Sequence, residues 1–499
     1  MTAPAVELRG IDKRFGEVHA NRDVSVAVRP GTIHGIVGEN GAGKSTLMGI
    51  LYGYYQPDRG EILVRGEPTA LRSAQDALAA GIGMVHQHFM LVEPFTVLEN
   101  VVLGAEGGVR LEPALARARA ALERLGRDYH LEVDPDARVA NLSVGQRQRV
   151  EILKALYRGA DVLILDEPTA VLTPAEADHL FRILRSLRDE GKAVLLITHK
   201  LREIRAVTDV VTVMRQGRIV ATLPTAETTA EQLAELMVGR AVSLRVDKTP
   251  ARPGEPLLEV TDLVVEDALG VPRVKRVGFT VRRGEIVGIA GVAGNGQSEL
   301  LEALAGIRPA KSGQIRVRGR RVAHVPEDRQ RMGLIMAFAA QESAILGHHD
   351  EPAYNGAVLM KQSAVAASFS RQAAEYDIRP ANGALATSAF SGGNQQKIVL
   401  ARELDRNPDV LLVGQPTRGV DIGAIEFVHR RLVALRDAGK ALLVVSVELD
   451  EIMALADRIL VMHDGRIVGD MPRAAATEQT LGLLMAGVTE PSPRNRTLV

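Results

Sequence analysis

The chain has 499 residues, of which 46% are hydrophobic and 24% charged, and it carries 61 basic and 61 acidic side chains. One hydrophobic core rarely grows beyond about 300 residues, so at least two domains are expected. A formal net charge of zero argues against a general nucleic-acid binder, and the lack of cysteine excludes disulfides and cysteine-ligated zinc.

The amino-terminal residues show neither the basic stretch nor the apolar core of a secretory signal. No apolar run approaches the roughly 20 residues that a membrane helix needs, and the longest, such as residues 441–447, have the length of a strand. We therefore expect any function at a membrane to be exercised through a partner protein.

The first informative motif lies between a short apolar run at residues 32–37, which predicts a strand, and a helical run at residues 46–51. It matches GxxxxGKS, the phosphate-binding loop of P-loop NTPases, and consists of Gly38, Glu39, Asn40, Gly41, Ala42, Gly43, Lys44 and Ser45. In such a loop the backbone N–H groups face phosphate oxygens, the lysine reaches the β- and γ-phosphates, and the serine hydroxyl binds Mg²⁺. We expect these residues, with Thr46, to bind a nucleotide.

Further along, after a predicted helix at residues 114–125, an apolar run predicts a strand that ends in Asp166 and Glu167. Ligands of α/β sheets bind at the carboxyl ends of the strands, so both carboxylates are expected beside the phosphate loop. Asp166 is placed to hold Mg²⁺, directly or through water, and Glu167 to orient and polarise the attacking water. A second apolar strand at residues 194–198 ends directly before His199, which is expected to contact the γ-phosphate.

The chain contains this pattern twice. Residues 142–220 align without a gap on residues 390–468, which lie 248 positions later, and the phosphate loop aligns on residues 291–298, which lie 253 positions later. A period near 250 residues is too long for a solenoid repeat and indicates a duplicated domain.

The predicted organisation is a first domain at residues 4–240, a proline-bearing linker at 241–255, a second domain at 256–488 and a polar tail at 489–499. Within each domain, apolar β-rich runs alternate with helical stretches. This alternation predicts the α/β class, with a mostly parallel sheet in each domain.

The order of the motifs resembles the nucleotide-binding subunit of ABC transporters, and the resemblance covers nearly the whole chain. It rests on the phosphate loop, the signature segment Ser143-Val144-Gly145-Gln146, the Asp-Glu strand and the histidine that follows the next strand. It implies two tandem P-loop ATPase domains, each with a helical subdomain and an antiparallel β subdomain. It also implies that Gln87 senses Mg²⁺ and the membrane partner, and that Phe15 stacks on adenine, with core packing as the alternative for Phe15.

The second copy lacks the chemical groups of the first. The replacements, each at the aligned position, are Gln297 for Lys44 (before Ser298), Gly414 for Asp166, Gln415 for Glu167 and Val447 for His199. No aromatic residue occurs between positions 257 and 278, so the adenine platform is also absent. We expect no hydrolysis in the second pocket, while weak nucleotide binding on its glycine loop stays open.

The signature segments show the opposite trend. The second copy has the intact form, Ser391-Gly392-Gly393-Asn394-Gln395, whereas the first copy has a valine, Val144, between Ser143 and Gly145. The two domains of ABC ATPases pair head-to-tail, so the resemblance implies that the intact loop faces the intact signature. One hydrolytic and one degenerate composite site are therefore expected. Thr173 stands where the family usually has an aspartate, which the second copy keeps as Asp421, and this leaves the communication between the sites open.

Tandem ATPase domains with a degenerate second copy resemble the simple-sugar importers, and residues 84–91, 324–329 and 415–427 look more like the nucleoside-importing branch. The resemblance implies ATP and Mg²⁺ as cofactors. It implies two membrane permease subunits and an extracytoplasmic substrate-binding protein as partners, no nucleic acid, and a peripheral location on the cytoplasmic face of the inner membrane. Monosaccharide import is the alternative. A tandem ABC factor acting on ribosomes is disfavoured, because the linker is short and nearly neutral and one site is degenerate.

Overall fold

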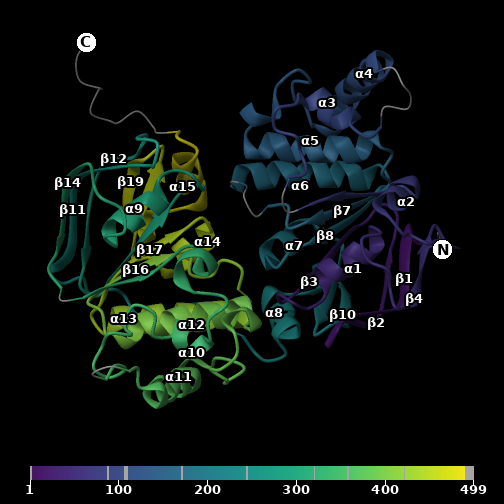
Figure 1. Cartoon of the computed structure of the whole chain (residues 1–499). Helices are drawn as coiled ribbons and strands as arrows, with labels where there is room; N and C mark the ends of the chain where they lie inside the picture. The colour runs from purple at the N-terminus through teal and green to yellow at the C-terminus, as the bar shows by residue number, and fades with distance from the viewer. Residues whose placement is uncertain are drawn as a thin grey trace, which may run out of the picture. The chain divides into compact units, whose positions relative to one another are not determined.

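The computed structural model describes residues 3–86, 89–105, 111–169, 172, 174–242, 246–319, 321–356, 359–420 and 422–488. The chain divides into two compact units, Met1–Leu244 and Arg245–Val499. Each unit contains an antiparallel sheet and a larger, mostly parallel sheet with helices packed on it (Figure 1). The α/β fold with a mostly parallel sheet in each half of the chain is thus confirmed.

The antiparallel sheet of the first unit has the strand order β2-β1-β4-β5. Its strands are β1 Val6–Phe15, β2 Val18–Val28, β4 Arg59–Val64 and β5 Glu67–Pro68. Buried and exposed residues alternate along the second half of β2, as expected for a strand with one face on the core.

The larger sheet of the first unit has the order β10-β9-β3-β8-β7-β6, and every neighbouring pair is parallel except β9 and β10. Its strands are β3 Ile33–Gly38, β6 Ile82–Val85, β7 Val162–Asp166, β8 Ala193–Ile197, β9 Val210–Arg215 and β10 Arg218–Pro224. β3 and β8 are buried along their whole length, which explains why their sequences are apolar without alternation.

Eight α-helices of the first unit lie within the described residues. They are α1 Lys44–Leu51, α2 Ala74–Ala79, α3 Val97–Val102, α4 Leu111–Tyr129, α5 Val144–Tyr157, α6 Pro174–Asp189, α7 Leu201–Val207 and α8 Ala230–Val238. In Figure 1, α3, α4 and α5 form a group of helices at one side of the parallel sheet. α6 packs against β8 and β3 of that sheet, and α1 lies between the two sheets. The helix predicted at residues 114–125 is the middle of α4.

The second unit repeats this arrangement. Its antiparallel sheet has the order β12-β11-β14, and its larger sheet has the order β15-β16-β17-β13-β18-β19. The strands are β11 Pro256–Glu266, β12 Pro272–Arg282, β13 Glu285–Ala290, β14 Ser312–Val317, β15 Val322–Val325, β16 Val410–Gly414, β17 Ala441–Ser446, β18 Arg458–His463 and β19 Arg466–Pro472.

The helices of the second unit follow the same order along the chain. They are α9 Gln297–Leu304, α10 Ala340–Ser343, α11 Gln362–Tyr376, α12 Gly392–Asp405, α13 Ile422–Asp437, α14 Leu449–Leu455 and α15 Glu478–Met485. One core joins α9 to both sheets of this unit, as α1 is joined in the first unit. Both phosphate-loop segments therefore run from a buried strand to a buried helix, which limits how far either can move.

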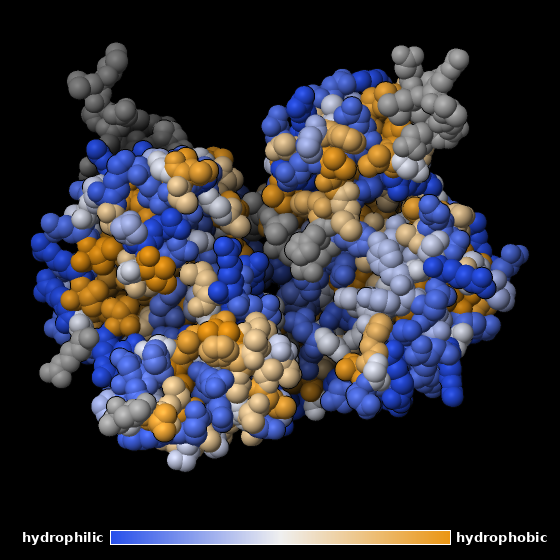
Figure 2. All heavy atoms as spheres, viewed as in Figure 1, coloured by the Kyte–Doolittle hydropathy of each residue, from blue (hydrophilic) through white to orange (hydrophobic). Residues whose placement is uncertain are grey.

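Hydrophilic side chains cover much of the visible face of both units, with smaller apolar areas between them (Figure 2). Among the helices that the described residues form, none is both long enough and apolar enough to cross a membrane.

The central strand β3 carries a buried histidine. His34 is 3% exposed, and its Nε2 lies 2.7 Å from Thr212 Oγ1 on β9. Burial disfavours the charged ring and lowers its pKa to about 4, from an ordinary value of 6.5. The unfolded chain therefore binds one more proton than the folded chain between these two pH values.

We predict that the free energy of unfolding decreases as the pH falls from 6.5 to 4. In this range His34 is protonated in the unfolded chain but stays neutral in the folded chain, so protons favour unfolding. The contribution amounts to about 3 kcal/mol over that range. His34→Gln should therefore show a smaller drop in melting temperature between pH 7 and pH 5 than the wild type does. His130→Gln, at an exposed position, is the control. Equal pH dependence of the wild type and His34→Gln would contradict the prediction.

Candidate active site

The phosphate loop of the first unit connects the end of β3 at Gly38 to the start of α1 at Lys44. Gly43, the residue before the helix, has a φ of 97°, and a Cβ there would lie 2.3 Å from Ala20 O, so only glycine fits. Gly43 offers no side-chain cap to the first turn of α1. The N–H groups of this turn are therefore available to a phosphate group, and the helix dipole favours negative charge there.

Lys44 is buried within this loop. Its Nζ donates to Gly38 O at 2.6 Å and to Glu39 O at 3.0 Å. Burial lowers the pKa of the ammonium, and the carboxylates of Glu167, Asp166 and Glu39 act in the opposite direction. The ammonium thus lies folded back on its own loop, where an incoming phosphate oxygen can replace a carbonyl acceptor with a charged one.

Asp166 and Glu167 stand at the carboxyl end of β7, beside the loop. Burial and the neighbouring Glu167 carboxylate raise the pKa of Asp166 to about 6, although the Lys44 ammonium lowers it. Glu167 has a left-handed backbone, with a φ of 47°, and its N–H donates to Ile197 O at 2.8 Å. At Glu167 the backbone therefore leaves the extended conformation of the strand.

His199 lies two residues after the end of β8 and contacts Glu167. Its Nδ1 lies 2.9 Å from Glu167 Oε1. This hydrogen bond is the largest influence on Glu167 and holds the pKa of that carboxyl below its usual range. Glu167 is therefore ionised at neutral pH, as a residue that accepts a proton from water requires.

A buried network fixes the segments on both sides of this pair, and the sequence did not reveal it. The hydroxyls of Thr169 and Thr198 both donate to the carboxylate of Glu203, on α7, and the Thr198 bond measures 3.1 Å. Gln148 on α5 donates to Pro168 O at 2.7 Å. The available signal was the recurrence of these residue types 248 positions later, as Thr417, Ser446, Glu451 and Gln396.

Phe15 ends β1 and is 42% exposed. Its ring makes a T-shaped contact with the Tyr55 ring at a centroid distance of 5.1 Å, and Lys13 Nζ lies 5.4 Å from its centroid. Packing in the core, the alternative role for Phe15, is therefore excluded. A partly exposed ring is what stacking on a base requires, and the stacking itself stays a prediction.

The signature segments start two corresponding helices. Ser143 caps α5 and accepts a hydrogen bond from Gln146 N, and Ser391 caps α12 and accepts one from Asn394 N. A Cβ on Gly392 would lie 2.5 Å from an Arg329 nitrogen and 2.6 Å from Gly419 O, so glycine is needed there for packing within the second unit. Gln87, Thr173 and Asp421 lie outside the described residues.

The second unit keeps the shape of the pocket with different side chains. Gly296 before α9 has a φ of 95°, and Gln415 has a φ of 47°, nearly the values of Gly43 and Glu167. The Gln297 amide donates to Val292 O at 3.1 Å, and Gln415 Oε1 accepts from Val447 N at 3.3 Å. The backbone therefore forms the same loop and corner without the ammonium, the two carboxylates or the histidine.

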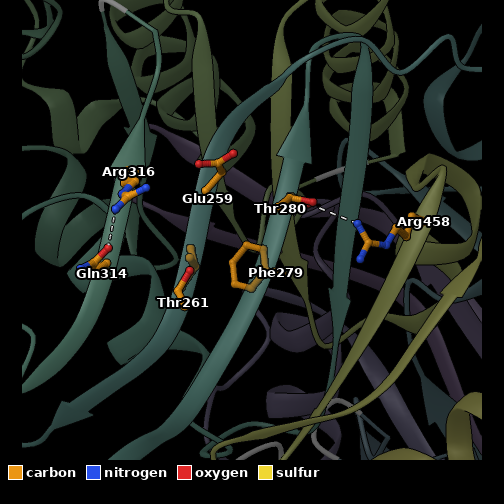
Figure 3. Close-up of a pocket in the computed structure, with 8 residues that line it drawn as sticks. Glu259, Thr261, Phe279, Thr280, Gln314, Arg316 and Arg458 are labelled. Carbon is orange, nitrogen blue, oxygen red and sulfur yellow. Dashed lines mark hydrogen bonds between the residues drawn. The ribbon is translucent and has the colours of Figure 1, made fainter.

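A separate cavity of about 530 Å³ lies on the second unit, against β11, β12 and β14 (Figure 3). Arg316 donates to Gln314 on the same strand, Arg458 donates to Thr280 O and to Asp470, and Glu259 accepts from Arg318. The charged side chains of its wall therefore already have partners within the protein. It lies apart from the phosphate-loop residues, none of which lines it.

The oxygen groups of the first pocket fit a magnesium ion. The exposed Ser45 and the carboxylate of Asp166 supply hard oxygen donors, and Mg²⁺ commonly binds one or two such groups with substrate phosphates and water. No cluster of three or more histidine, aspartate or glutamate ligands occurs in the part of the chain that the structure describes.

Comparison with known protein families identifies the class. The ABC transporter family model matches the chain twice, at residues 21–170 and 274–418. The chain therefore belongs to the ABC transporter family, and the two tandem ATPase domains expected from the sequence are confirmed. Membership of this family makes the chain an ATPase.

Three relatives resemble it over nearly its full length. The nucleoside import ATP-binding protein NupA of Lactococcus lactis is 47% identical, and the alignment covers 97% of this chain and 98% of NupA. The guanosine import ATP-binding protein NupO of Bacillus subtilis is also 47% identical, with 97% and 98% covered. The glucose import ATP-binding protein TsgD13 of Haloferax volcanii is 44% identical, with 97% and 96% covered. The expected resemblance to the nucleoside branch of the tandem importers is thus confirmed.

We predict that Glu203→Ala lowers kcat about tenfold or more and leaves the KM for ATP near its wild-type value. The substitution frees Thr169 and Thr198 from their shared acceptor and so loosens Glu167 and His199, but it does not touch the phosphate loop. Glu451→Ala, the equivalent change in the second unit, is the matched control for lost stability. Steady-state ATPase kinetics of both variants are the measurement. Equal losses of kcat in the two variants would show that the effect is general.

Proposed function

We propose that this chain is the ATP-hydrolysing subunit of an importer for nucleosides, in which only one of two ATP sites hydrolyses ATP. The first unit supplies the observation that carries the proposal: a charged lysine, two carboxylates and a histidine meet at one pocket. The equivalent residues of the second unit are neutral. The names of NupA and NupO support nucleosides as the cargo.

Each group of the first pocket has a task in this proposal. Lys44 and the N–H groups of its loop bind the phosphates, and Phe15 provides a face for adenine. Ser45, Asp166 and Gln87 hold Mg²⁺, which neutralises charge on the phosphates. Glu167 accepts a proton from the attacking water, and His199 keeps Glu167 ionised and positions the water at the γ-phosphate.

The proposal includes a head-to-tail pairing of the two units, as in the family. The intact signature, Ser391 to Gln395, then completes the pocket of the first unit. The altered signature around Val144 faces the degenerate pocket. The altered signature of the first unit and the replaced side chains of the second unit then belong to the same composite site. This is why we favour pairing within one chain.

The partners in this proposal are two transmembrane permease subunits and an extracytoplasmic substrate-binding protein, and the chain is a peripheral protein on the cytoplasmic face of the inner membrane. The lack of a membrane-crossing helix among the described residues is compatible with this place. Monosaccharide import is the second candidate, supported by the similarity to the glucose importer subunit TsgD13. The ATPase chain does not contact the cargo, so transport itself must decide between them.

We predict that Lys44→Ala loses both ATP binding and ATP turnover, and that Glu167→Gln loses turnover while ATP still binds, because only the proton acceptor is removed. Gln297→Ala, the matched change in the second unit, should barely alter the turnover rate. ATPase assays and nucleotide-binding titrations of the three variants are the measurement. Substantial hydrolysis by Lys44→Ala would refute a single hydrolytic site.

We also predict that two polytopic membrane subunits co-purify with this chain from its native membrane, and that cells expressing the complex take up labelled adenosine or guanosine in preference to ribose or glucose. Cells carrying Glu167→Gln are the control for ATP-driven uptake. Uptake of the sugars alone would establish the second candidate. Co-purification with ribosomes in place of membrane subunits would refute import altogether.

A further inference from the structure

Glu327 is the counterpart of Gln87 in the sequence, as the register of the strands that precede them indicates. In the first unit Val85 of β6 pairs with Leu165 of β7, and in the second unit Val325 of β15 pairs with Val413 of β16. Glu327 follows Val325 by two residues, as Gln87 follows Val85. The second unit therefore has a carboxylate at the position that the first unit fills with an amide.

The side chain of Glu327 points into the phosphate loop of its own unit. Ser298 is the equivalent of Ser45, and its hydroxyl donates a hydrogen bond to the Glu327 carboxylate. The family resemblance assigns Ser45 and Gln87 to a common Mg²⁺ ion. In the second unit the two equivalent side chains bond each other, so the gap that a metal would bridge is closed.

The space of the missing aspartate is also occupied. A Cβ built on Gly414, the equivalent of Asp166, would lie 2.5 Å from Cγ of Glu327 and 3.0 Å from its backbone N. An aspartate at position 414 would therefore collide with Glu327. The glycine at position 414 therefore leaves the space that the Glu327 side chain occupies.

The charge of this pocket disfavours phosphate. Gln297 supplies no positive charge at the position of Lys44, and its amide is bonded to the loop carbonyl of Val292. Glu299 and Glu302 add negative charge near Glu327, and Arg418 acts as the opposing cation. A triphosphate would have to enter beside a carboxylate with no ammonium to face it, and like charges at close range repel each other.

We propose that Glu327 is a built-in block of the second pocket: by bonding Ser298 and filling the space beside Gly414, it takes the place of Mg²⁺ and prevents the binding of Mg²⁺-ATP. The second unit then acts without a nucleotide of its own. This inference deepens the proposed one-site function, on which it rests, by adding that the second loop is unoccupied as well as inactive.

Counting the bound nucleotide tests the block. Equilibrium dialysis with radiolabelled ATP and Mg²⁺ is done on the full-length chain carrying Glu167→Gln, so that bound ATP is not consumed. It should give one ATP per chain, and none when Lys44→Ala is added. Two ATP per Glu167→Gln chain would overturn the inference. That result would leave the proposed function intact if Lys44→Ala were still inactive, so the failure of one can be told from the failure of the other.

A second series asks whether Glu327 is the cause. Lys44→Ala combined with Gln297→Lys restores a lysine to the second loop, and we expect it still to bind no ATP. Adding Glu327→Gln, which installs the residue type of the first pocket with the same shape, should raise the affinity for Mg²⁺-ATP about tenfold or more. Glu299→Gln in the same background removes a neighbouring charge but leaves the Glu327–Ser298 bond in place, so it should raise the affinity clearly less than Glu327→Gln does.

Two outcomes of this series contradict the proposal. One is ATP binding by the Lys44→Ala, Gln297→Lys chain as tight as that of the chain with Glu327→Gln added. The other is no gain from Glu327→Gln in a chain whose melting temperature matches the wild type. Because glutamine and glutamate have nearly the same size, the comparison stays valid even where larger changes at this half-buried position disturb folding.

Discussion

The parallel register of three neighbouring strands is the constraint on which the active pocket depends. Ile36 on β3 pairs with Ile197 on β8, and Ile197 pairs with Asp166 on β7. This row brings the end of β3, the carboxylates and His199 to one edge, although the residues are far apart in the chain. In the second unit the same row is formed by Ile289, Val445 and Gly414. Hydrogen bonds between strands therefore preserve the site geometry even where the reactive groups have been replaced.

The duplication separates the requirements of the fold from those of the chemistry. The left-handed glycine before each helix, Gly43 and Gly296, is present in both units, and so is the left-handed corner at Glu167 and Gln415. These features serve main-chain packing, since Gly43 allows the approach of Ala20 O and Glu167 N bonds Ile197 O. The lysine, the carboxylates and the histidine are missing from the second unit, yet the backbone there keeps the same loop and corner.

The two pockets differ in the side chains that surround the phosphate loop. In the first unit Asp166 and Glu167 lie close enough to Lys44 to influence its pKa, and His199 bonds Glu167. In the second unit Glu327 fills the space beside Gly414 and bonds Ser298. The ammonium and carboxylates of the first pocket thus correspond to a side-chain hydrogen bond in the second, and burial raises the pKa of Glu327 as it does that of Asp166.

The sequence by itself determined the duplicated α/β domains, the phosphate loop, the Asp-Glu strand and the residues lost from the second copy, because these depend on contiguous motifs with fixed spacing. It did not reveal the network around Glu203 or the exposure of Phe15, which arise from contacts between distant segments. It also gave Glu327 no role. The offset between the copies is 253 residues at the phosphate loop, 240 at Glu327 and 248 at the signature, because the connecting loops differ in length. Only the pairing of β15 with β16 in the tertiary structure restores the correspondence, and only side-chain packing decides that a carboxylate lies beside Ser298.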